Sequence, residues 1–123
     1  MAIENAAEGC VRETFGALVA AWQATHAGDA SVRATLQQVA REETRHAALA
    51  WEVARWAERH LPRIDRERVA DARTRALLRL KAEAGVEPPR ELVDTLGLPT
   101  ADQATRLFDG MVRALRMETA TAT

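Results

Sequence analysis

Apolar residues recur along the chain at alternating steps of three and four, which is the spacing of an amphipathic helix. The first 60 residues carry two such stripes. The first runs through Glu4, Glu8, Val11, Phe15, Leu18 and Trp22, and the second through Val32, Leu36, Val39, Glu43, His46, Ala50, Val53 and Ala57. No segment shows the two-residue alternation of a β-strand. The pattern therefore predicts an all-α protein.

Turn and cap residues divide the first half into two helices. We expect one helix over residues 3–25 and a second that ends near residue 60. Gly28 ends the first, and either Asp29 or Ser31 caps the second. Because so short a connection reverses the chain, the two helices should form an antiparallel hairpin over residues 3–60.

The second half predicts another hairpin, over residues 62–117, with a short extra helix inside it. Pro62 ends the preceding helix, and the next one closes at Gly85. Pro89 opens a short helical piece, and Thr100 with Gln103 has the spacing of a capping box for a last helix. The small, polar tail over residues 118–123 should fray.

Composition places limits on size and partners. With 123 residues, 47% of them hydrophobic and 28% charged, the chain fits one helical domain, residues 1–123. The formal net charge is −1 and basic residues are dispersed, so we predict neither a nucleic-acid partner nor a membrane. Cys10 is the single cysteine, and no signal pattern precedes the first helix. We expect a cytoplasmic protein, or a fragment of a longer protein whose compartment the sequence does not reveal.

Glu43 and His46 are the candidate chemistry. On a helix the i, i+3 spacing brings a carboxylate and an imidazole to one face. Both residues also occupy positions of the second apolar stripe, so we expect them in the core. A buried carboxylate costs several kcal/mol unless it is paired or coordinated. The pattern therefore predicts a metal ligand pair. The alternative is a Glu43 carboxylate paired with Arg12 or Arg41 beside a hydrogen-bonded core histidine.

The ligand from the first helix is open between two acids. Glu8 shares the apolar stripe, so its face points to the second helix, whereas Glu13 is closer in height to Glu43 and His46. Glu13 lies on a face of small residues, which more often serves close helix contact. We favour Glu8 and keep Glu13 as the alternative. Cys10 is expected to pack in the interior. His26 and His60 are expected at exposed helix ends.

The segments Glu8–Thr14 and Arg41–Trp51 resemble a helix pair of bacterial ferritin-like proteins. In that superfamily a Glu on one helix and a Glu-x-x-His on the next supply half of a di-iron or di-manganese centre. The resemblance covers residues 4–57. It implies a ferritin-like antiparallel bundle in which Glu8, Glu43 and His46 are ligands and Glu43 bridges the metals.

One departure from that family shapes the functional hypothesis. Neither later helix contains a Glu-x-x-His, so one chain holds half a site. A homodimer or higher homo-oligomer would supply the other half, an arrangement similar to encapsulated ferritins, and a missing N-terminal helix pair would do the same. We expect an oxidoreductase or ferroxidase-like protein that reacts with O2 or peroxide. The alternative is a metal-free helical module for interaction or oligomerisation.

Overall fold

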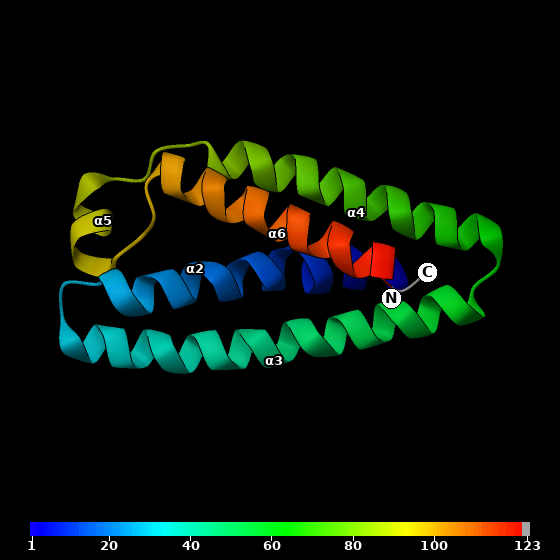
Figure 1. Cartoon of the computed structure of the whole chain (residues 1–123), viewed down its shortest axis with the longest axis horizontal. Helices are drawn as coiled ribbons and strands as arrows, with labels where there is room; N and C mark the ends of the chain where they lie inside the picture. The colour runs from blue at the N-terminus through cyan, green and yellow to red at the C-terminus, as the bar shows by residue number, and fades with distance from the viewer. Residues whose placement is uncertain (122–123) are drawn as a thin grey trace.

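The computed structural model describes the backbone of residues 1–121 and the side chains of residues 1–116. Its elements are α1 (Ala2–Glu4), η1 (Asn5–Arg12), α2 (Glu13–His26), α3 (Ala30–His60), α4 (Arg63–Ala84), α5 (Arg90–Leu96) and α6 (Ala101–Thr121). The first three form one continuous rod, and the long helices lie side by side, with the N-terminus and the described end of α6 near one end and α5 at the other (Figure 1). The predicted all-α class is confirmed: residues 1–121 contain no strand.

The helix boundaries follow the predicted stop and cap residues. Asp29 caps α3, because its Oδ1 accepts hydrogen bonds from the backbone N–H groups of Ser31 at 2.7 Å and Val32 at 3.2 Å. The Ser31 hydroxyl donates to the same oxygen. This bond first, and then the two backbone bonds, hold the pKa of the Asp29 carboxyl below its usual range. Pro62 separates α3 from α4, and Gly85 follows α4.

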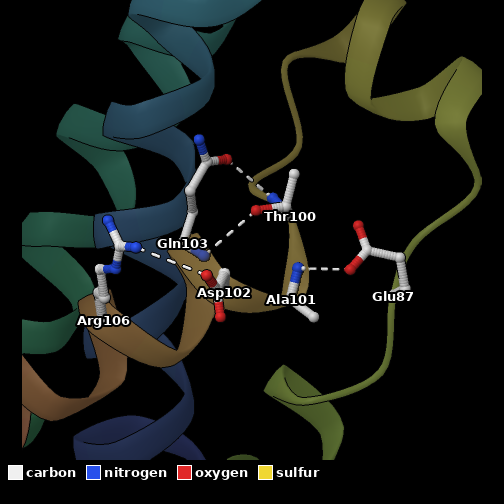
Figure 2. Close-up of polar contacts among 6 residues, drawn as sticks. All are labelled: Glu87, Thr100, Ala101, Asp102, Gln103 and Arg106. Atoms are coloured by element: carbon white, nitrogen blue, oxygen red, sulfur yellow. Dashed lines mark hydrogen bonds and ion pairs between the residues drawn. The ribbon is translucent and has the colours of Figure 1, made fainter.

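The capping box that opens α6 is present in full (Figure 2). The Gln103 side chain accepts from the Thr100 N–H at 2.9 Å, and the Thr100 hydroxyl accepts from the Gln103 N–H at 3.2 Å. Glu87, from the preceding loop, accepts from the Ala101 N–H at 3.1 Å. Helix α6 extends to Thr121, so the predicted frayed tail overlaps its last turn, and residues 122–123 lie outside the described part.

The hydrophobic core lies where the N-terminal rod, α4 and α6 meet. Phe15 and Phe108 pack edge to face, with ring centroids 6.3 Å apart. The buried members of this cluster are Val11, Phe15, Ala76, Leu80, Ala84, Ala104, Phe108 and Met111. No helix within residues 1–121 has the length and apolar character needed to cross a membrane.

Helix α3 packs on the N-terminal rod through small residues. A Cβ atom added to Gly9 would lie 2.7 Å from the Ala50 Cβ, closer than real side chains approach. About two turns further along, a Cβ on Gly16 would lie 3.6 Å from the Glu43 carboxylate. The small-residue face of the first helix therefore makes the close contact, as the sequence indicated. We call this contact the α2–α3 seam.

Helix α5 and the loop after it close the end of the bundle at the α2–α3 turn. The Gly28 N–H donates to the Thr95 carbonyl at 3.3 Å, and the Gln23 side chain donates to the Leu96 carbonyl at 3.1 Å. Gly97 has φ +68°, and a Cβ there would come within 2.7 Å of the His26 carbonyl carbon. Only glycine fits this position.

Candidate metal centre

Glu43 and His46 lie together but not in the core. The Glu43 Oε1 and His46 Nδ1 atoms are 3.9 Å apart, and the two side chains are 32% and 59% exposed. The expectation that both occupy buried core positions is therefore wrong for the single chain. Without burial, the Glu43 carboxylate needs no compensating charge to be stable, so the case for a metal rests on the ligand types and their geometry.

The reason for this exposure is the narrow strip that α3 buries. Its buried residues are Ala47, Ala50 and Ala57, with Glu43 at the edge of that strip and His46 beyond it. Val39, another member of the predicted stripe, is 36% exposed. Because α3 is covered mainly by the N-terminal rod, one edge of its apolar stripe remains uncovered.

Glu8 belongs to a different polar group. Its side chain is 72% exposed and lies 3.9 Å from Arg12, which donates two hydrogen bonds to Glu83 of α4 at 2.8 and 2.9 Å. The bonds to Arg12 hold the pKa of the Glu83 carboxyl below its usual range. Hydrogen bonding to Glu83 raises the pKa of Arg12. The bidentate pair ties η1 to α4.

The register of the hairpin decides which acid is level with the Glu43–His46 pair. Gly9 faces Ala50 and Gly16 faces Glu43, so the numbers of any two residues that lie opposite each other across the seam add up to 59. By that register His46 is level with Glu13. Glu13 is three residues from the level of Glu43, about 4.5 Å along the axis, whereas Glu8 is eight residues away, about 12 Å. The structure thus supports the height argument for Glu13, and Glu8 as a ligand stays a prediction.

A π-helix over Asn5–Arg12 is the feature that the sequence did not reveal. It contains both Glu8 and Gly9. A π turn holds more residues than an α turn, so extrapolation of an α-helical face through this segment misplaces its side chains. Wide helical turns of this kind are common at functional sites.

Within residues 1–116, no three side chains of His, Cys, Asp or Glu gather closely enough to hold a metal ion. A single chain offers the Glu43–His46 pair. The two arginines that could have neutralised Glu43 have other partners: Arg12 binds Glu83, and Arg41 donates to Gln38 at 2.8 Å. Within residues 1–116, neither arginine therefore neutralises the Glu43 carboxylate, whose charged neighbour is His46.

Cys10 packs in the interior, as expected. The side chain is fully buried, and its thiol donates to the Ala50 carbonyl, with Sγ and O 3.4 Å apart. Asn5 donates to the same carbonyl at 2.9 Å. Burial raises the pKa of the Cys10 thiol, against the opposing charge of Arg73. A neutral, inaccessible thiol is a poor ligand and nucleophile.

The other histidines occupy helix ends, as predicted. His26 stacks on Trp22 and His60 on Trp56, with ring centroids 3.9 and 4.7 Å apart. Each ring places Nδ1 within hydrogen-bond distance of the tryptophan backbone carbonyl, at 2.7 and 2.8 Å. Both histidines are exposed and remote from Glu43 in the sequence.

Comparison of this chain with known protein families, with curated proteins and with solved structures finds no match.

Proposed function

We propose that this chain is a ferritin-like protein whose homodimer holds a di-iron or di-manganese centre. The observation that carries the proposal is the 3.9 Å separation of Glu43 Oε1 and His46 Nδ1 on one rigid helix. Two donors bound at about 2.1 Å to one metal ion lie roughly 3–4 Å apart. A carboxylate with an imidazole suits iron and manganese.

We take Glu13 as the third residue that each chain would contribute to the shared centre of the dimer. The seam register supports this choice, because Glu13 is level with His46 whereas Glu8 lies about 8 Å further along the axis. Glu13 is also partly buried. Burial is the main cause that raises the pKa of the Cys10 thiol, and the negative charge of Glu13 raises it further. Glu8 remains the second choice and is tested beside Glu13.

A second copy would complete the site. A two-fold axis beside Glu43 and His46 would bring together two carboxylates and one imidazole from each chain. The resulting four carboxylates and two imidazoles are the ligand set that di-iron carboxylate proteins use. The exposure of both side chains, and of Val39 on the same stripe, leaves this edge of α3 accessible to a partner. When bound, such a centre would supply oxidation by O2 or peroxide, and the chain would act as an oxidoreductase or ferroxidase. The chain's own residues would hold and orient the metals.

The test is metal content and solution mass of the same anaerobically iron-loaded sample, for the wild type and four variants. We expect about one ion per chain in a dimer, and loss of iron in Glu43→Gln, His46→Ala and Glu13→Gln. Glu8→Gln should keep its metal. Retention in Glu13→Gln with loss in Glu8→Gln would reverse the choice of third ligand.

Glu42→Gln is the matched control, because Glu42 is the exposed neighbour of Glu43 and its carboxylate accepts from Gln38 at 3.0 Å. It should bind iron like the wild type. Undiminished iron binding by Glu43→Gln, or tight binding by a verified monomer, would overturn the shared centre.

A metal-free interaction module is the second candidate function. The Glu8–Arg12–Glu83 group favours it, since arginine neutralises acids there without a metal. In that case iron leaves the melting temperature unchanged, and Glu43→Leu is neutral or stabilising. A metal-bound dimer would instead melt higher with iron than without it.

A further inference from the structure

An open cavity of about 540 Å³ lies between α4 and α6, which run side by side (Figure 1). We call it the α4–α6 cavity. Its floor is apolar, with Phe108 buried and Leu77 and Val112 partly buried. The described lining comes from α4 and α6, so a ligand here would lie away from Glu43 and His46 on α3.

Three cations line the same cavity: Lys81 from α4, and Arg113 and Arg116 from α6. Among the side chains of residues 1–116, none of the three has an acid within 4.0 Å. The acid in the described lining is Asp109, one turn from Arg113. Three cations and one acid leave the lining with a surplus of positive charge.

The charges just outside the lining on α4 do not offset this surplus. Asp71 and Arg75 each stand within one turn of a lining residue, and their opposite charges cancel. Glu83, two residues from Lys81, accepts both hydrogen bonds of Arg12. Positive charges that gather on a concave surface with apolar walls attract anions.

The apolar groove between α3 and α6 provides a comparison within the same bundle. Its volume is similar, about 510 Å³, but its described lining has a single charged side chain, Arg106, which lies 3.5 Å from Asp102. A neutral apolar molecule has no reason to prefer the α4–α6 cavity to this groove. The surplus charge of the α4–α6 cavity therefore selects a ligand with an anionic group.

The size of the cavity limits the apolar part of that ligand. An α-helix is about 10–12 Å across with its side chains, so two turns of a partner helix occupy roughly 1,000 Å³. The α4–α6 cavity, at about 540 Å³, is smaller than this and has a volume typical of small-ligand sites. A bare inorganic anion, in turn, would leave the apolar floor uncovered.

We propose that the α4–α6 cavity binds an amphipathic anion, a single alkyl chain with an anionic head, of which a fatty acid is the simplest. The chain would cover the exposed parts of Leu77 and Val112. Arg113 and Arg116, one turn apart on α6, would hold the head between two guanidinium groups, and Lys81 would face it from α4. The apolar stems of these cations would extend the wall along the chain.

The probes are octanoate, octanol and acetate, which separate the effect of the charge from that of the chain. Binding to the full chain is followed by amide NMR titration. We expect octanoate to bind about tenfold more tightly than octanol, because charge-assisted hydrogen bonds hold its head. The amide signals of Leu77 and Val112 should shift, and acetate should not saturate. Added salt should weaken the binding of octanoate but not that of octanol.

Two double variants test the position of the head. Arg113→Gln with Arg116→Gln should lower the affinity for octanoate about tenfold, to that of octanol, and leave octanol binding unchanged. Arg59→Gln with Arg79→Gln is the matched control, because it removes the same charge from exposed arginines outside the described lining. This control should bind octanoate like the wild type.

Leu78→Glu tests the position of the chain. Leu78 lines the cavity and is 64% exposed, so this variant should fold. It should weaken octanoate and octanol together, because it replaces an apolar wall by a carboxylate. Circular dichroism melts confirm that each variant is folded.

Any of four results overturns the proposal: no probe saturates, octanoate and octanol bind equally, acetate matches octanoate, or folded Arg113→Gln with Arg116→Gln binds octanoate like the wild type. Sedimentation with phosphatidylglycerol vesicles gives a fifth. If the wild type binds the vesicles, this double variant does not, and octanoate fails to bind, the cations face a membrane surface and the cavity ligand is excluded. None of these readouts depends on metal content, so the metal proposal is judged separately.

Discussion

The two sides of α3 differ in one respect: one has a helix against it and the other does not. On the seam, Gly9 and Ala50 bring the N-terminal rod close to α3. On the other side, the apolar groove of about 510 Å³ separates α3 from α6, and its lining includes the small residues Ala47, Ala48 and Gly110 together with larger ones such as Trp51 and Leu107. There α3 and α6 make few contacts. Small residues thus permit close helix packing but do not by themselves produce it. The seam also has Asn5 and Cys10, which bind the Ala50 carbonyl.

Phe108→Ala should have the largest effect, because Phe108 anchors α6 and is 5% exposed in contact with Phe15. We expect a loss of about 3 kcal/mol in the free energy of unfolding, the lower end for Phe→Ala, since Phe108 lines an open cavity between α4 and α6 into which the site can relax. Urea unfolding measures it. Leu78→Ala, at a side chain that is 64% exposed, should stay within about 0.5 kcal/mol of the wild type. Equal losses in the two variants would contradict the assigned core.

Gly9→Val overpacks the seam, where even a Cβ would lie 2.7 Å from the Ala50 Cβ. The free energy of unfolding should fall by about 1–3 kcal/mol. Adding Ala50→Gly removes the opposing methyl and should recover part of that loss in a double-mutant cycle. Strictly additive effects would mean that the two residues do not oppose each other.

Gly110→Ala is the matched substitution on the open side. The new Cβ meets nothing, so the variant should gain about 0.5–1 kcal/mol from helix propensity alone. The same urea assay applies. A loss of stability here would show that α3 and α6 close on each other in solution.

Arg12→Gln should have the smallest effect, through the exposed Arg12–Glu83 pair. Arg12 lowers the pKa of Glu83 below its usual value of 4.5. The pair therefore stabilises the folded protein above pH 4.5, and this contribution is lost as the pH falls through the lower pKa of Glu83 in the folded state. We expect a loss of a few tenths of a kcal/mol at pH 7 and a smaller one at pH 3. Arg63→Gln, which breaks an exposed pair within α4, is the control. A larger loss at pH 3 than at pH 7 would contradict the sign.

Local signals predicted the helices well, because caps and breakers act over a few residues. Asp29, Pro62 and the Thr100–Gln103 box fix boundaries without reference to the rest of the chain. The π-helix could not be anticipated, since it changes the period on which the face argument for Glu8 depended. The burial of Glu43 and His46 could not be predicted either. The apolar stripe through Glu43 indicates a helix face that is favourable to bury, but it does not indicate whether this chain or another one buries it.

Gly97 closes one end of the helix bundle. Its backbone, with φ +68°, lets the loop after α5 press against the α2–α3 turn, far from both the N-terminus and the described end of α6 (Figure 1). The two hairpins are thereby fastened at this end, and at the opposite end the short connection between α3 and α4 joins them through the chain itself (Figure 1). Because the chain runs from Gly97 into α6, the glycine also determines where α6 begins relative to α2 and α3. A side chain at position 97 would displace the loop after α5, and the position of α6 beside α3 would change with it.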